Sequence, residues 1–222
     1  MRINKFIAQS SMISRRKADE LILSKRIKIN GFPAQIGSSI TETDIVLLDD
    51  KPLNSPSPKM TLMLNKPIGY VVSRNGQGSR TIYDLLPQQY HQLNPIGRLD
   101  KNSSGLLLLT NDGNLALKLS HPRYQKIKIY NIILNKDLQP IHAQLINDYG
   151  ITLKDGVSKL QLTKIDDNNA KGWSVTMSEG RNRQIRRTFE SLGYDVIALQ
   201  RITFGNYNLN NLPLGKFKLI NS

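Results

Sequence analysis

The sequence predicts an α+β protein in two parts. A stretch with three prolines and little to bury, residues 51–59, is typical of an extended linker. Before it, helical spacing of apolar residues is followed by short alternating strands, and after it strand-like runs alternate with turns and short helices. We therefore place one domain at residues 1–50, the linker at 51–59 and a second domain at residues 60–222.

The composition points to a polyanionic partner. The 222 residues include 31 Lys and Arg against 17 Asp and Glu, which gives a formal net charge of +14. A surplus of this size on a folded domain is most often found in proteins that bind nucleic acid, although charge that only keeps a protein soluble is the alternative. The absence of cysteine excludes disulfides, thiolate nucleophiles and cysteine-ligated metals.

The sequence gives no indication of export or membrane insertion. The first ten residues carry no apolar segment behind their charges, so we expect no signal peptide. The longest apolar run, Leu106–Leu109, is far shorter than the ~20 residues that a membrane-spanning helix needs. We expect a cytoplasmic protein without membrane contact.

Each element of the first domain has a local signal. Apolar residues at helical spacing predict a helix over 3–7, and Ser14 is a suitable N-cap for a second helix over 15–22. An alternating strand then runs into an Asn-Gly pair at 30–31, which favours positive φ and a tight turn. A final strand is predicted over 44–48.

Cations gather in this small domain. Arg15, Arg16 and Lys17 open the second predicted helix, and Arg26 follows it. A solvated helix face is one interpretation. A phosphate-binding surface is the other, and we favour it because free N–H groups at a helix start add to the same anion site.

The second domain begins with two predicted strands, 61–65 and 70–73, joined by a turn. The loop at 76–78 falls short of a dinucleotide fingerprint because no βαβ pattern surrounds it, and no P-loop occurs. The three histidines are far apart in the sequence, so we expect no metal site. A turn at 112–113 precedes a predicted helix over 114–119.

The polar loop before the apolar run at 106–109 holds Asp100 beside Arg98. A carboxylate at the mouth of a buried strand is held rigidly, as a nucleophile must be. The alternative from the residues alone is a loop aspartate that pairs with Arg98 or caps the backbone turn.

The segment 126–133 alternates strictly, with Lys126, Lys128 and Tyr130 on one face and isoleucines on the other. An aromatic side chain between lysines on an open sheet face suits stacking on a base with phosphates nearby. An ordinary half-buried strand with extended lysines is the alternative.

A predicted strand over 173–177 leads to four arginines within 181–187 and then to a helix. Its buried stripe is formed by 185, 189 and 192, and Gly193 ends it. A solvated face with Arg186 paired to Glu190 is the alternative to a functional cluster.

Residues 2–31 read RINKFIAQSSMISRRKADELILSKRIKING. This segment resembles an S4 RNA-binding domain, a small helical hairpin with strands. The resemblance covers residues 1 to about 48 and implies RNA contacts for Arg15, Arg16, Lys17 and Arg26.

Across the whole chain the motifs are KPIG, GRLD, SGLLLLTNDG, KIY, EGRNRQIRR and LPLGKFKLI. In combination they resemble the ribosomal-RNA pseudouridine synthases that carry an S4 domain. Ser103 departs from the pattern, since many relatives have threonine there, but it keeps the hydroxyl. The resemblance implies a mixed, mainly antiparallel sheet with flanking helices, and a reaction that needs no cofactor and no metal.

The resemblance also implies roles for individual residues. Asp100 is the catalytic carboxylate that acts on a flipped-out uridine, Tyr130 stacks on the base, and Arg186 pairs with the carboxylate. Leu199 lines the apolar floor of the uracil pocket. The remaining substrate-binding residues are Arg98, Leu99, Lys128 and Arg183.

By this resemblance the protein is a monomer that converts a specific uridine of ribosomal RNA to pseudouridine, with large-subunit RNA favoured. Its partner is ribosomal RNA or a ribosomal assembly intermediate. Small-subunit RNA and tRNA are alternative substrates. A non-catalytic S4-domain RNA-binding or assembly factor is the alternative function, but it would have no use for Asp100, Tyr130 and Arg186 in one place.

Overall fold

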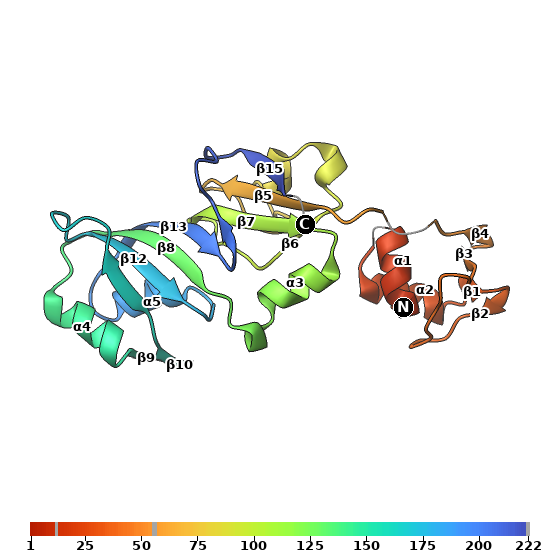
Figure 1. Ribbon diagram of the computed structural model, residues 1–222, viewed down its shortest axis with the longest axis horizontal. Helices are drawn as coiled ribbons and strands as arrows, with labels where there is room; N and C mark the ends of the chain where they lie inside the picture. The colour runs from red at the N-terminus through yellow and green to blue at the C-terminus, as the bar shows by residue number, and fades with distance from the viewer. Residues whose placement is uncertain (12, 55–56, 221–222) are drawn as a thin grey trace. The chain divides into compact units, whose positions relative to one another are not determined.

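A computed structural model describes residues 1–11, 13–54 and 57–220. The chain divides into two compact units, Met1–Lys59 and Met60–Ser222, whose elements are labelled in Figure 1. Each unit has its own apolar core. Residues 55 and 56 of the predicted linker lie outside the described residues.

The first unit packs two helices against a small sheet. Its elements are α1 (Ile3–Ser10), α2 (Arg15–Leu23), β1 (Ile27–Ile29), β2 (Phe32–Pro33), β3 (Val46–Leu48) and β4 (Lys51–Pro52), with strand order β2-β1-β3-β4. The Ser14 side chain accepts a hydrogen bond from the Lys17 N–H, which confirms the predicted N-cap. Asn30 and Gly31 both have positive φ, as the predicted tight turn requires.

The predicted linker starts too early. Lys51 and Pro52 form β4 and pair with β3, and the Leu53 N–H donates to the Val46 carbonyl over 2.9 Å. The turn between the strands is made by Asp49 and Asp50, both at positive φ. Aspartate tolerates this conformation, so the two aspartates can form the turn of a hairpin. The prolines of the segment predicted a linker instead, and the first strand residues were assigned to it.

The second unit is built on a mixed sheet. Its main path runs in the order β11-β12-β8-β13-β7-β5-β15, and β14 and β6 pair with β13 and β7. Of the described pairs, β13 with β7 is parallel and the others are antiparallel, which confirms the mixed, mainly antiparallel sheet. The strands are β5 (Thr61–Lys66), β6 (Asn94–Pro95), β7 (Ser104–Thr110), β8 (Lys128–Leu134), β11 (Gln161–Lys164), β12 (Gly172–Met177), β13 (Val196–Phe204), β14 (Tyr207–Asn208) and β15 (Phe217–Ile220).

Helices cover both faces of this sheet. Buried residues of α4 (Pro140–Asp148) and α5 (Gln184–Glu190) join the larger core cluster, and α3 (Gly113–Ser120) contributes Leu119 to the smaller one. Strand β7 supplies Leu107 and Leu109 to the first cluster and Leu106 and Leu108 to the second, so the four-leucine run is a strand buried on both faces. A hairpin of β9 (Ile151–Leu153) and β10 (Gly156–Ser158) and three short 3-10 turns, Ile82–Leu85, Gln88–Tyr90 and Pro122–Tyr124, complete the unit.

The predicted strand over 70–73 is wrong. Within it Val71 makes a single bridge with Thr81, and Val72 and Ser73 after it are bends. The Val71 N–H donates to the Arg80 carbonyl, and the Ile82 N–H donates to the Val71 carbonyl. The β-branched residues of this segment predicted a strand. A strand also needs a neighbouring strand to form its hydrogen-bond ladder, and this segment pairs only with Thr81 at the start of a 3-10 turn. None of the described helices is long and apolar enough to cross a membrane.

Candidate active site

Three neighbouring strands bring distant segments to the middle of the sheet. Strand β7 follows the Asp100 loop, and β13 lies between it and β8, which carries Tyr130. Arg201 of β13 pairs in register with Gly105 of β7 and with Tyr130 of β8. Gly105 has φ +103°, and a Cβ there would lie 2.2 Å from the Arg201 carbonyl oxygen, so the close approach of β7 and β13 requires glycine.

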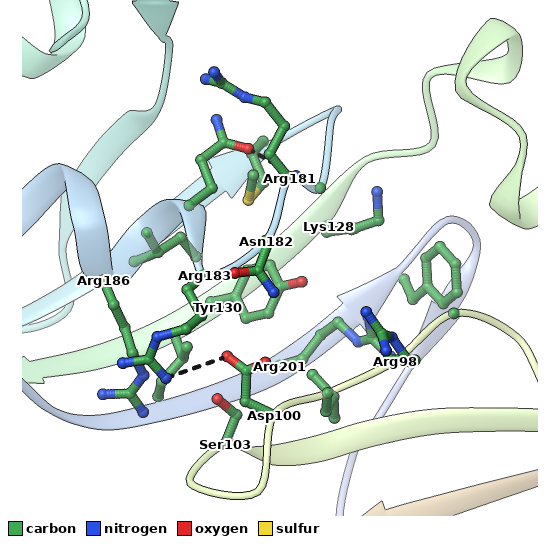
Figure 2. Close-up of a pocket in the computed structure, with 18 of the residues that line it drawn as sticks. Arg98, Asp100, Ser103, Lys128, Tyr130, Arg181, Asn182, Arg183, Arg186 and Arg201 are labelled. Atoms are coloured by element: carbon green, nitrogen blue, oxygen red, sulfur yellow. Dashed lines mark hydrogen bonds and ion pairs between the residues drawn. The ribbon is translucent and has the colours of Figure 1, made fainter. Parts of the chain in front are cut away.

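These strands, the loop before β7 and the start of α5 line an open cavity of about 350 Å³, shown in Figure 2. All the catalytic and substrate-binding residues implied by the resemblance line it: Arg98, Leu99, Asp100, Lys128, Tyr130, Arg183, Arg186 and Leu199. Most of its charged lining is cationic. This lining suits a ligand in which anionic phosphates flank a ring of the size of a nucleobase.

Asp100 stands at the cavity wall with 37% of its side chain exposed. Its Oδ2 lies 3.8 Å from Nη1 of Arg183, so the cation beside it is neither Arg98 nor Arg186 (Figure 2). Arg183 has φ 47° at the N-cap of α5. This left-handed turn carries its side chain toward Asp100, a direction that helical spacing does not predict.

Arg186 binds backbone carbonyl groups and not the Asp100 carboxylate. Its guanidinium donates to the carbonyl of Val196 and, over 2.7 Å, to the carbonyl of Asn102. Neither the predicted pairing with the Asp100 carboxylate nor the alternative ion pair with Glu190 describes these contacts. Burial and the neighbouring Arg183 charge lower the pKa of Arg186, and the Asp100 charge partly offsets them.

The face of β8 that carries Lys128 and Tyr130 is enclosed, not open. Tyr130 is 8% exposed and belongs to the core cluster, whereas Ile133 on the opposite face is 45% exposed. The expectation of an open sheet face is therefore wrong. α5 and the loop before β7 cover this face, so the tyrosine ring forms a wall of the cavity.

Lys66 is a site residue that sequence reasoning missed. It is fully buried at the end of β5, and its Nζ donates to the carbonyls of Pro67, Asp100 and Ser103 over 3.0, 3.1 and 2.7 Å. Burial lowers the pKa of Lys66 to about 8, against the opposing effect of the Asp100 charge. The ammonium group ties both sides of the Asp100 loop to the sheet. Its signal was the KPIG motif, which indicates a turn and supports the family resemblance but does not by itself give Lys66 a role.

We expect activity to fall as the pH rises through about 8. The ammonium form of Lys66 has three N–H donors for its three carbonyl partners, whereas the neutral amine has two and leaves one buried carbonyl without a donor. The pH profile of kcat for Lys66→Met should be lower throughout and lack this alkaline fall. An unchanged alkaline limb in the folded variant would assign the limb to another group.

The other two arginines of the cluster are structural. Arg181 donates to the carbonyls of Asp155, Gly156 and Val157, and Arg187 forms an ion pair with Asp155 at 2.8 Å. They fasten the β9–β10 hairpin to the start of α5. The hydrogen bond from Arg187 also holds the pKa of the Asp155 carboxyl below its usual value.

The predicted RNA-binding residues of the first unit are exposed. Arg15 donates to Asn4, Lys17 pairs with Glu20, and Arg26 pairs with Asp49. Exposed ion pairs of this kind are weak, so RNA phosphates can compete for these cations. RNA contact by Arg15, Arg16, Lys17 and Arg26 stays a prediction.

Family models match both units. Residues 60–191 match the model described as RNA pseudouridylate synthase, and residues 1–46 match the S4 domain. The chain belongs to the RNA pseudouridylate synthase family and is an enzyme of that class. This confirms the resemblance predicted from the motifs.

Individual relatives span nearly the whole chain. It is 36% identical to an uncharacterized RNA pseudouridine synthase of Aquifex aeolicus, over 100% of this chain and 90% of that protein. It is also 36% identical to the ribosomal large subunit pseudouridine synthase B of Bacillus subtilis, over 96% of this chain and 89% of that one. A crystal structure of a pseudouridylate synthase superposes with a TM-score of 0.70 at 28% identity, covering 100% of this chain and 96% of the other.

Proposed function

We propose that the protein converts a uridine of ribosomal RNA to pseudouridine, with Asp100 as the catalytic carboxylate. The position of Asp100 carries the proposal: its carboxylate lines a cavity walled by Tyr130 and rimmed by arginines, and its loop is held from two sides by Lys66 and Arg186. The name of the Bacillus subtilis relative supports large-subunit RNA as the substrate, either free or in an assembly intermediate.

The reaction breaks the N1–C1′ bond of uridine, turns the uracil and joins C5 to C1′. It involves no net oxidation and loses no group, so side chains suffice for it. The reacting atoms are inaccessible inside a helix, and the uridine must therefore leave its stack. The Asp100 carboxylate then acts at C1′ or C6, or removes a ribose proton.

The other cavity residues hold the flipped nucleotide in this proposal. Tyr130 stacks on the uracil, and Leu99 and Leu199 supply the apolar floor. Arg98 and Arg183 bind RNA around the opening. The exposed cations of the first unit bind phosphates outside the target nucleotide, which adds affinity but no chemistry.

The proposal is tested with ribosomal RNA labelled with tritium at uracil C5. Since C5 exchanges its hydrogen for the bond to C1′, we expect the protein to release tritium from large-subunit RNA, and pseudouridine mapping should locate one or a few modified sites. Labelled small-subunit RNA in the same assay is the control for substrate choice. Release from small-subunit RNA alone would overturn the large-subunit assignment. No release from ribosomal RNA or from assembly intermediates would overturn the ribosomal substrate.

A further inference from the structure

Two cations of the cavity lining, Lys128 and Arg201, form no ion pair with a carboxylate in the part of the chain that the structure describes. Arg201 lies with Cζ 4.8 Å from the centroid of the Phe204 ring, and Nζ of Lys128 lies 5.7 Å from the same centroid. Both side chains line the cavity (Figure 2). Contact with one aromatic ring offsets part of the cost of desolvating two cations, but it does not neutralise them.

Arg201 is the more deeply buried of the two, at 2% exposure. Its Nε donates to the Leu106 carbonyl over 2.8 Å. Its Nη2 is buried and has no hydrogen-bond partner in the part of the chain that the structure describes. A buried charged donor left without an acceptor costs free energy, so this guanidinium is suited to an acceptor that arrives with the substrate.

Lys128 adds a second positive charge to the same place. Its Nζ donates to the Glu179 carbonyl over 3.0 Å. Burial together with the Arg201 charge lowers the pKa of Lys128, and the Glu179 charge partly opposes this shift. A Cβ at Gly180 would lie 3.4 Å from this Nζ, so the backbone there passes close to the ammonium group. The two cations are held near each other by the fold although they repel.

The carboxylates of this region already have partners. Glu179 accepts from Gln184 and lies 3.3 Å from Arg181, and Asp100 lies beside Arg183. The Glu179 charge offsets part of the Lys128 charge, but in the part of the chain that the structure describes neither carboxylate forms an ion pair with Lys128 or Arg201. A bound anion would relieve the repulsion and supply the missing acceptor, whereas a neutral carbonyl of uracil would supply only the acceptor.

We propose that Lys128 and Arg201 form a phosphodiester subsite, which holds a backbone phosphate of the RNA beside the flipped uridine. This subsite rests on the proposed function in one respect, which is that the anion is the phosphate of an RNA strand. An arginine and a lysine that both donate to one phosphate would fix the position of the ribose in the cavity, and hence the distance of its C1′ from Asp100.

The subsite is tested by measuring the binding of three small probes to the full chain by NMR titration. The probes are uridine, uridine 3′,5′-bisphosphate and inorganic phosphate. In the wild type we expect the bisphosphate to bind at least about tenfold more tightly than either uridine or inorganic phosphate. Lys128→Met should lose most of that advantage over uridine. Lys218→Met, which removes an exposed lysine of β15 outside the cavity lining, is the matched control and should keep it.

Arg201→Met could unfold the protein, because the Arg201 side chain also supports the Leu106 carbonyl. Lys128→Met therefore decides the question, and Arg201→Lys, checked by thermal unfolding, serves as the second variant. Equal affinity of the wild type for uridine and the bisphosphate, or an advantage that survives in Lys128→Met, would overturn the subsite. Inorganic phosphate that binds as tightly as the bisphosphate would overturn its assignment to RNA.

Failure of the subsite can be distinguished from failure of the proposed function. Probe binding does not require turnover, and tritium release by the wild type does not require the probes. Tritium release without a bisphosphate advantage would overturn the subsite alone. A bisphosphate advantage that Lys128→Met removes, without tritium release, would support the subsite and overturn the ribosomal substrate.

Discussion

Asp100→Asn is expected to abolish pseudouridine formation and leave RNA affinity near that of the wild type. The amide keeps the shape of the side chain but is a far poorer nucleophile or base than a carboxylate. Lys66 and Arg186 hold the loop through the carbonyls of Asp100 and Asn102, and the substitution leaves both carbonyls in place. Tritium release and equilibrium binding to ribosomal RNA measure the two quantities.

Asp137→Asn is the matched control for this variant, since Asp137 is exposed and lies outside the lining of the active-site cavity. It should behave as wild type in both assays. If Asp100→Asn kept even about a tenth of the wild-type rate, Asp100 could not be the group that makes or breaks a bond. A large loss of RNA affinity would assign Asp100 to binding.

Local chemistry explains the parts of the fold that the sequence predicts well. Ser14 caps its helix with its own side chain, and the Asn-Gly pair at 30–31 turns the chain because of its backbone preferences. The apolar run at 106–109 can only be buried, and it forms a strand covered on both faces. The cap and the turn need no distant segment, and the burial of the apolar run follows from its composition, whereas its strand partners do not.

The contacts within the site depend on distant segments, and there the sequence is a weaker guide. The motifs predict which residues line the cavity, but the partner of Asp100 is Arg183 because of one left-handed residue at the start of α5. Lys66 reaches three carbonyls only after β5 and β7 have paired. The orientation of Tyr130 likewise follows from which face of β8 the helices cover.

The roles of Arg183 and Arg186 can be separated by substitution. Arg186 joins α5 to the Asp100 loop and to β13 through two charge-assisted hydrogen bonds, each worth about 1.5–3 kcal/mol in typical proteins. The Arg183–Asp100 pair is half exposed, and exposed pairs contribute up to about 1 kcal/mol. We therefore expect Arg186→Lys to lower kcat by about a hundredfold and Arg183→Met by about fivefold or less, with both rates measured by tritium release.

Arg186→Lys is the decisive variant because it keeps the positive charge near Asp100. An ammonium group is a point charge and does not reproduce the planar fork that spans the carbonyls of Val196 and Asn102. If Arg186 acts by positioning the loop, lysine should not restore kcat, and KM should change little because the cationic rim remains. Near-wild-type activity of Arg186→Lys would mean that the charge alone matters. A larger loss in Arg183→Met than in Arg186→Lys would make Arg183 the essential partner of the carboxylate.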